Sequence, residues 1–140
     1  MAIDSCAAKQ EITEVLVRYA TGIDRRDWSC FRTCFVSDCR CEYGEFGTFD
    51  GVEAITKFMI DSHADMGLTL HRLSNIAIAV HGERAEARSY VDAVLMASDG
   101  ATGVNPIGYY DDDLVHDGEV WRIAKRRLTM VALRTIGGPL

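Results

Sequence analysis

The chain has 140 residues, a length typical of one domain that can bury a sizeable hydrophobic core. Its 48% hydrophobic and 26% charged content is ordinary for a soluble globular protein. A net charge of −6 and the lack of a long basic run argue against nucleic acid or an anionic membrane as a partner. No apolar stretch approaches the roughly 20 residues that span a bilayer, and the N-terminus lacks a secretion-signal pattern. We therefore expect a single cytoplasmic domain over residues 1–140.

The first half of the chain has mainly helical periodicity, with apolar residues recurring three and four positions apart. It predicts, in chain order, helices over 8–22 and 28–36, a strand or hairpin arm over 39–49, and a helix over 52–65. Gly22 is a plausible end for the first helix, and Asp27 can cap the second.

The second half of the chain changes to the period of β-strands, with predicted strands over 68–80, 84–97, 104–116 and 119–133. The joints at 81–83, 98–100 and 117–118 are short turn sequences, which favours an antiparallel meander. Helices followed by a long antiparallel sheet indicate an α+β fold. A strongly curved sheet can wrap its concave face around the helices and leave an apolar cavity open at one end.

Three polar residues are placed where they can meet in such a cavity. Tyr19 and Asp24 lie at the end of the first predicted helix, and His71 opens a predicted strand. A carboxylate that reaches an imidazole fixes its tautomer and stabilises its protonated form, so that the imidazole can act as a base. The phenol of Tyr19 can hold a substrate oxygen or protonate a leaving group, or it can be a core aromatic. His71 is expected to share its strand face with Thr69, Leu73 and Asn75.

Several further residues are candidates for substrate contacts. The apolar and aromatic candidates are Trp28, Tyr43, Phe46, Phe58, Val94 and Met96. Tyr90 and Asp92 share a strand face with Val94 and can add polar contacts, or lie on the surface if that face turns outward. Arg127 can meet an anionic group of the substrate, although the Lys125–Arg127 run also fits a solvated surface.

The sequence favours no metal or cofactor site. Four of its five cysteines fall between positions 30 and 41 without a nearby histidine, so we expect reduced, partly buried thiols. Asp111, Asp112 and Asp113 are adjacent on a strand and alternate between its faces, which favours an exposed, charged strand over a metal site. The other histidines, His63, His81 and His116, are expected on the surface. No glycine-rich nucleotide loop, serine-hydrolase elbow or zinc-protease motif is present.

The order of these elements resembles the nuclear transport factor 2-like superfamily over nearly the whole chain. The resemblance rests on four segments: VLVRYATGIDRRDWSCFRTCF, GTFDGVEAITKFM, LTLHRLSNIAI and GYYDDDLVHDGEVWRIAKRRL. Within the superfamily, they are most similar to the SnoaL-like group, which includes scytalone dehydratase, hexachlorocyclohexane dehydrochlorinase and bile-acid 7α-dehydratase. This resemblance implies a cone-shaped fold with N-terminal helices in the concave face of the sheet.

The same resemblance implies catalytic roles for Asp24 and His71, and a role for Tyr19 that matches the bile-acid dehydratase. It indicates a cofactor-independent lyase that acts on a hydrophobic cyclic or aromatic small molecule, and a homo-oligomer, either dimer or trimer. Two alternatives stay open. One is an isomerase, cyclase or retro-aldol lyase that uses the same dyad, and the other is a non-catalytic binding or assembly module.

Overall fold

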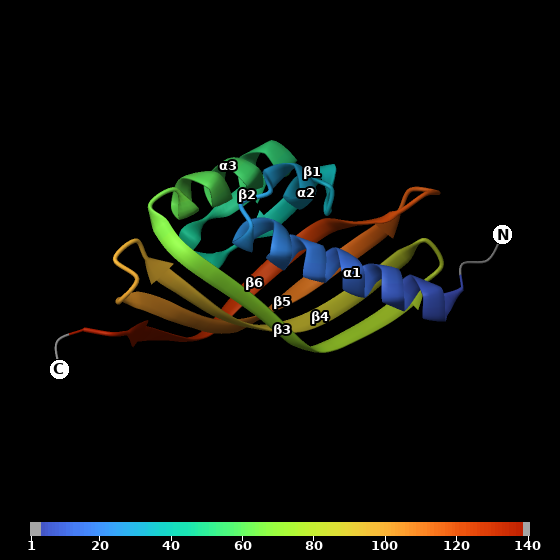
Figure 1. The fold of residues 1–140 in the computed structure, drawn as a ribbon. Coiled ribbons are helices and arrows are strands. Elements are labelled where there is room, and N and C mark those ends of the chain that lie inside the picture. The colour runs from blue at the N-terminus through green and yellow to red at the C-terminus, as the bar shows by residue number, and fades with distance from the viewer. Residues whose placement is uncertain (1–3, 139–140) are drawn as a thin grey trace.

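The computed structural model describes residues 4–138, which form three α-helices, one short 3-10 helix and six strands (Figure 1). In chain order these are α1 (Ser5–Asp24), α2 (Trp28–Arg32), β1 (Phe35–Glu42), η1 (Gly44–Phe46), β2 (Thr48–Asp50), α3 (Val52–His63), β3 (Met66–His81), β4 (Arg84–Ala97), β5 (Gly103–His116) and β6 (Trp121–Ile136). None of the helices in the described part of the chain is long and apolar enough to cross a membrane.

The strands form one mixed sheet in the order β2-β1-β6-β5-β4-β3. The β3–β4, β4–β5 and β5–β6 pairs are antiparallel, as the short turns between them require. Only β1 pairs with β6 in parallel, and β2 folds back on β1, so the segment 39–49 predicted as a strand or hairpin arm belongs to a hairpin. The expected α+β fold with a mainly antiparallel sheet is confirmed.

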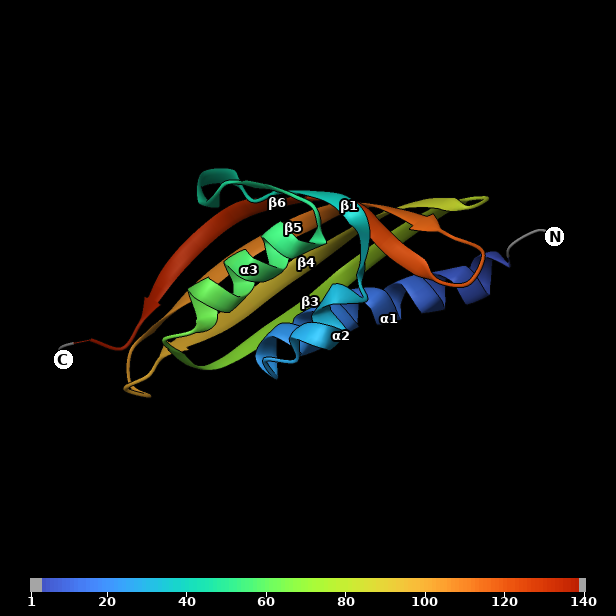
Figure 2. The same ribbon diagram turned by 90° about the horizontal axis from the view of Figure 1, so that it is seen from above.

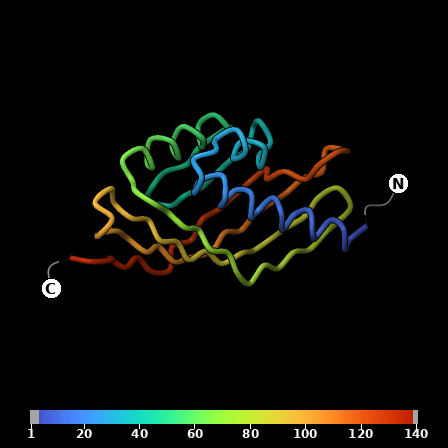
Figure 3. Tube along the Cα trace, viewed as in Figure 1, coloured from blue at the N-terminus to red at the C-terminus, as the bar shows by residue number. Residues whose placement is uncertain are grey.

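The helices lie together on one face of the twisted sheet (Figure 2). Helix α1 packs against β3 and β6, whereas α3 packs against β1 and β2, with α2 between the two longer helices. Small residues of β4 that face α1, such as Ala85 and Ala87, are almost fully buried. Figure 3 shows α1 crossing the long strands obliquely. The core therefore lies between the helices and the sheet.

The first helix begins and ends beyond its predicted bounds. Asp4 caps α1, because its side chain accepts a hydrogen bond from the backbone N–H of Cys6 at 2.9 Å. Gly22 does not end the helix, which continues to Asp24. A Cβ atom at Gly22 would lie 3.1 Å from the backbone nitrogen of Phe31, so this glycine allows α2 to approach α1 closely.

The second helix is shorter than the predicted segment 28–36. Asp27 caps it as expected, by accepting a hydrogen bond from the backbone N–H of Cys30. The chain leaves the helix after Arg32, because the carbonyl of Cys34 accepts a hydrogen bond from the backbone N–H of Ile123 on β6. Pairing with β6 therefore outweighs the helical spacing of the apolar residues in this segment.

A bulge in β3 changes which side chains face the helices. The pairing with β4 shifts between Ser74 and Ala77, and Asn75 takes a positive φ of 49°. Thr69 and Leu73 share the inner face with His71 as predicted, but Asn75 is exposed. Beyond the bulge Ile76 faces inward, as do the isoleucine and valine that follow at alternate positions.

The aspartate triplet on β5 is only partly the exposed charged strand that was expected. Asp111 and Asp113 lie on the outer face, but Asp112 is 3% exposed and faces the core. There the guanidinium of Arg126 donates two hydrogen bonds to the Asp112 carboxylate, at 2.7 and 2.8 Å. Both side chains of this ion pair are fully buried. The sequence prediction was wrong at Asp112 because its partner is a single charged residue on the inner face of β6.

Substitution of Asp112 by Asn should destabilise the fold strongly, because it leaves the charge of Arg126 buried without a counter-ion. Loss of one partner of a buried ion pair typically costs about 3–5 kcal/mol. Urea unfolding of D112N measures this cost. The matched control is D111N, which removes the adjacent carboxylate from its exposed pair with Arg88 and should change stability little. Equal unfolding midpoints for the two variants would contradict the assigned role of the buried pair.

Candidate active site

A carboxylate and an imidazole meet where α1 ends beside β3. The Oδ1 atom of Asp24 lies 2.7 Å from Nδ1 of His71, and its Oδ2 atom accepts a hydrogen bond from the His71 backbone N–H at 2.8 Å. A carboxylate accepts hydrogen bonds, so the proton of the neutral imidazole lies on Nδ1. The side chains of His71 and Asp24 are 10% and 18% exposed. The arrangement leaves Nε2 of His71 with a free lone pair.

Neighbouring groups hold Asp24 in its charged form. Burial alone would raise the pKa of Asp24, but hydrogen bonds from the ring and backbone of His71 outweigh this, and the net pKa is lowered. Thr69 also donates a hydrogen bond to this carboxylate at 3.0 Å. Arg26 in turn donates to the hydroxyl of Thr69 and to the carbonyl of Gly67, both at 2.8 Å. The carboxylate is thus fixed in place from three directions.

His71 lines an apolar cavity of about 340 Å³ between the helices and the sheet. This volume lies in the range of small-molecule sites. The sheet contributes Val91, Ala93 and Leu95 from β4, Val104, Pro106, Gly108 and Tyr110 from β5, and Leu128, Met130 and Leu133 from β6. Tyr19, Tyr43, Phe46, Phe58, Met59, Ser62, His63 and Met66 complete the lining. Most of this surface is apolar, so the polar groups in it stand out as candidates for chemistry.

Two tyrosines that line the cavity bring their hydroxyl groups together. The hydroxyl oxygens of Tyr19 and Tyr43 are 2.5 Å apart. Burial is the main cause that raises the pKa of each phenol well above its ordinary value, so both stay protonated at neutral pH. The guanidinium of Arg126 lies 4.2 Å from the ring centre of Tyr19 and 3.9 Å from that of Tyr110. Sequence reasoning treated Tyr43 only as a lining residue and did not select Tyr110.

A family model for the SnoaL-like domain matches residues 4–127. The chain belongs to the SnoaL-like domain family. Among curated relatives of this SnoaL-like protein are uncharacterized proteins of Mycobacterium tuberculosis and Mycobacterium bovis. Each is 26% identical over 128 residues, which cover 90% of this chain and 87% of the relative.

Solved structures similar to this SnoaL-like domain include proteins described as a dehydratase and a dehydrochlorinase. One is a proposed scytalone dehydratase from Novosphingobium aromaticivorans, with a TM-score of 0.84, 22% identity, and coverage of 94% of this chain and 93% of that one. Another is a type 3 hexachlorocyclohexane dehydrochlorinase from Novosphingobium barchaimii, with a TM-score of 0.81, 17% identity, and coverage of 96% and 92%. At these identities the likeness establishes the shared fold.

Four predicted contacts on β4 lie outside the cavity of this SnoaL-like domain. The residues that face the cavity are odd-numbered from Val91 to Leu95, so Tyr90, Asp92, Val94 and Met96 lie on the other face. Asp92 accepts a hydrogen bond from Asn105 and pairs with Arg72 on that face. The sequence itself indicates which face of β4 points outward. Charged residues at 84, 86 and 88 share the even-numbered face, and β4 runs without a bulge.

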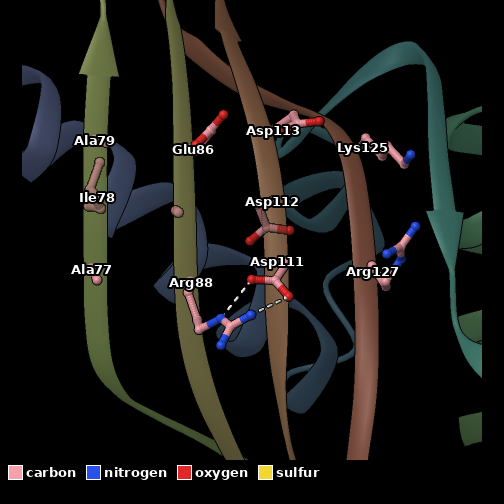
Figure 4. A pocket seen from close by; sticks show the side chains of 11 residues that line it. Ala77, Ile78, Ala79, Glu86, Arg88, Asp111, Asp112, Asp113, Lys125 and Arg127 are labelled. Atoms are coloured by element: carbon pink, nitrogen blue, oxygen red, sulfur yellow. Dashed lines mark hydrogen bonds and ion pairs between the residues drawn. The ribbon is translucent and has the colours of Figure 1, made fainter.

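Arg127 also lies outside the cavity. It borders a hollow on the face of the sheet opposite α1, where charged side chains of β4, β5 and β6 lie close together (Figure 4). Arg127 donates to Glu42 at 2.9 Å, and Arg88 binds both carboxylate oxygens of Asp111. These charges are paired and largely exposed to solvent, so the hollow is a solvated surface. We place the candidate site in the apolar cavity, because His71, Tyr19 and Tyr43 all line it.

Two other aromatic residues differ from expectation. Trp28 does not line the cavity, and its ring packs against Phe31 and His63 instead. His63 is not a surface residue, since it is 6% exposed and lines the cavity. The helical spacing that placed Val52, Ile55 and Met59 inward continues to His63, one turn further along α3. That spacing was the signal that sequence reasoning did not use.

His63 should remain neutral in the folded protein at pH values where an ordinary histidine is protonated. Burial lowers its pKa below 6.5 and outweighs the opposing effect of the Met59 carbonyl. The unfolded chain then binds a proton that the folded chain does not, so stability should fall as the pH drops below about 6.5. Ring signals of His63 in NMR titrations should move only below this pH. The H63F variant should lose part of the pH dependence of its unfolding free energy, and an unchanged slope would contradict the assignment.

Proposed function

We propose that this SnoaL-like protein is a cofactor-independent lyase that eliminates water or halide from a hydrophobic cyclic or aromatic small molecule. The contact between Asp24 and His71, 2.7 Å long at the wall of the apolar cavity, is the observation that carries the proposal. The dehydratase and the dehydrochlorinase among the similar structures agree with the proposal. At their low sequence identity, however, the similarity supports a shared fold and not a shared activity. A binding or assembly module would not require a charged carboxylate to orient an imidazole inside the cavity.

In the proposed reaction, Nε2 of His71 removes a proton from a carbon next to an activating group of the substrate. Asp24 holds the proton on Nδ1, so the lone pair of Nε2 is directed away from the carboxylate. The imidazolium that forms is stabilised by the adjacent negative charge. The electron pair of the broken C–H bond then forms the new C=C bond as the leaving group departs.

Tyr19 and Tyr43 are suited to assist the leaving group. Both phenols are neutral, and because one donates to the other, the accepting hydroxyl keeps its own proton for a leaving group. A departing hydroxyl takes a phenol proton and leaves as water, whereas a departing halide leaves as an anion that accepts a hydrogen bond. Proton exchange with solvent then restores the tyrosine and the neutral imidazole. Isomerisation, cyclisation and retro-aldol cleavage share the first proton transfer, and the tyrosine pair favours elimination because it supplies the acid.

The base can be tested before the physiological substrate is known. Hydrophobic cyclic ketones that carry a hydroxyl or halide β to the carbonyl are incubated with the protein in D₂O. Deuterium incorporation and elimination products are followed by NMR. H71A and D24N should each lower both rates by about 10²–10⁴-fold, the usual contribution of a general base. R127A is the matched control, because Arg127 lies outside the cavity, and it should retain the wild-type rates. Wild-type rates in H71A or D24N would overturn the proposal.

The role of the tyrosine pair has a separate signature. Tyr43→Phe removes one hydroxyl and should slow the elimination of water far more than the elimination of chloride, because hydroxide is the poorer leaving group and needs the proton. Deuterium incorporation by the same variant should stay near the wild-type rate, since His71 is unchanged. Elimination of water and chloride should therefore be compared on a matched pair of ketones. An equal loss for both leaving groups would show that the hydroxyl does not act as the acid.

A further inference from the structure

A second imidazole lies in the cavity wall and has no part in the proposed elimination. His63 ends α3, lines the cavity and is 6% exposed. Its ring centre is 6.1 Å from that of His71. The two imidazoles reach the cavity from different elements, His63 from α3 and His71 from β3.

The partners of His63 define its tautomer. Its Nδ1 atom lies 2.8 Å from the carbonyl oxygen of Met59, one turn earlier in α3, and 3.1 Å from the hydroxyl of Ser62. A carbonyl oxygen can only accept, so Nδ1 of the neutral ring carries the proton and donates it to Met59. The Nε2 atom consequently has a lone pair and can only accept a hydrogen bond.

No group among residues 4–138 satisfies this acceptor. Nε2 of His63 is buried and has no hydrogen-bond partner in the described part of the chain. Buried polar groups in folded proteins nearly always have a partner, because desolvation without one is costly. His63 packs against the ring of Trp28 and lines the apolar cavity. A donor to Nε2 therefore has to come from outside the described residues, and a molecule bound in the cavity can supply it.

We propose that Nε2 of His63 accepts a hydrogen bond from a hydroxyl group of the bound substrate, and so selects hydroxylated cyclic or aromatic compounds. The inference rests on the proposed function, because it names the substrate class of the same cavity. His63 acts as a specificity-determining acceptor and His71 as the base.

The different environments of the two imidazoles account for this division. Asp24 accepts a hydrogen bond from Nδ1 of His71 and places a full negative charge beside that ring. His63 has only the neutral carbonyl of Met59 in the corresponding position. Burial lowers the pKa of His63 and outweighs the opposing effect of the Met59 carbonyl. His63 is thus suited to accept a hydrogen bond without taking the proton.

A matched pair of ligands tests the inference by binding alone. The probes are 2-naphthol and 2-methoxynaphthalene, which share one bicyclic framework and differ in the hydroxyl hydrogen. Calorimetry measures their dissociation constants with the wild type, H63F and H63Q. The wild type should prefer 2-naphthol by up to about tenfold, the size of one hydrogen bond. H63F should lose the preference, and H63Q should retain it because its amide oxygen supplies an acceptor.

A measurement on the wild type covers the case in which a variant fails to fold. Nitrogen-15 spectra should show the His63 Nε2 signal moving upfield when 2-naphthol binds and staying in place with 2-methoxynaphthalene. Equal affinities in the wild type, a preference that persists in H63F, or a static Nε2 signal would each overturn the inference. A preference lost in H71F alone would assign the hydroxyl to His71 instead. These outcomes are independent of the D₂O rates that test the base, so either proposal can fail without the other.

Discussion

The site depends on the hydrogen bonds that the carboxylate of Asp24 accepts. This carboxylate accepts them from the ring and backbone of His71 and from the hydroxyl of Thr69, and so joins the end of α1 to the start of β3. The same contacts that attach the helix to the sheet also orient the imidazole. The position of the His71 ring is therefore set by the backbone and side-chain hydrogen bonds to one carboxylate.

A second polar layer extends under the cavity from the inner face of the sheet. Arg126 pairs with Asp112 and lies against the ring faces of Tyr19 and Tyr110. The charge of the guanidinium is thus compensated on one side and contacts aromatic rings on the other. Burial still holds Tyr19 and Tyr43 in the neutral form. The cavity consequently brings an imidazole and neutral phenols together within a mainly apolar lining.

The candidate site was predictable where local spacing and family order agreed. Asp24, His71 and Tyr19 were selected on their positions at a helix end and a strand start, and the structure brings Asp24 into contact with His71. Errors arose where the phase of a strand had to be chosen. On β4, the expected substrate contacts were Tyr90, Asp92, Val94 and Met96, with a surface position left open for Tyr90 and Asp92. The charged residues at 84, 86 and 88 already marked this even-numbered face as the outer one. His63 was missed because an imidazole at a helix end is usually exposed.

The sequence by itself determined the order of helices and strands, the α+β class and the turns of the meander, because these follow from periodicity and turn residues close together in the chain. Only the tertiary structure decided which residues meet across long sequence distances. The parallel pairing of β1 with β6 ended the second helix early, the bulge at Asn75 reversed the face of β3, and Arg126 drew Asp112 into the core. Each of these outcomes depends on a partner far away in the chain, and local patterns carry no information about it.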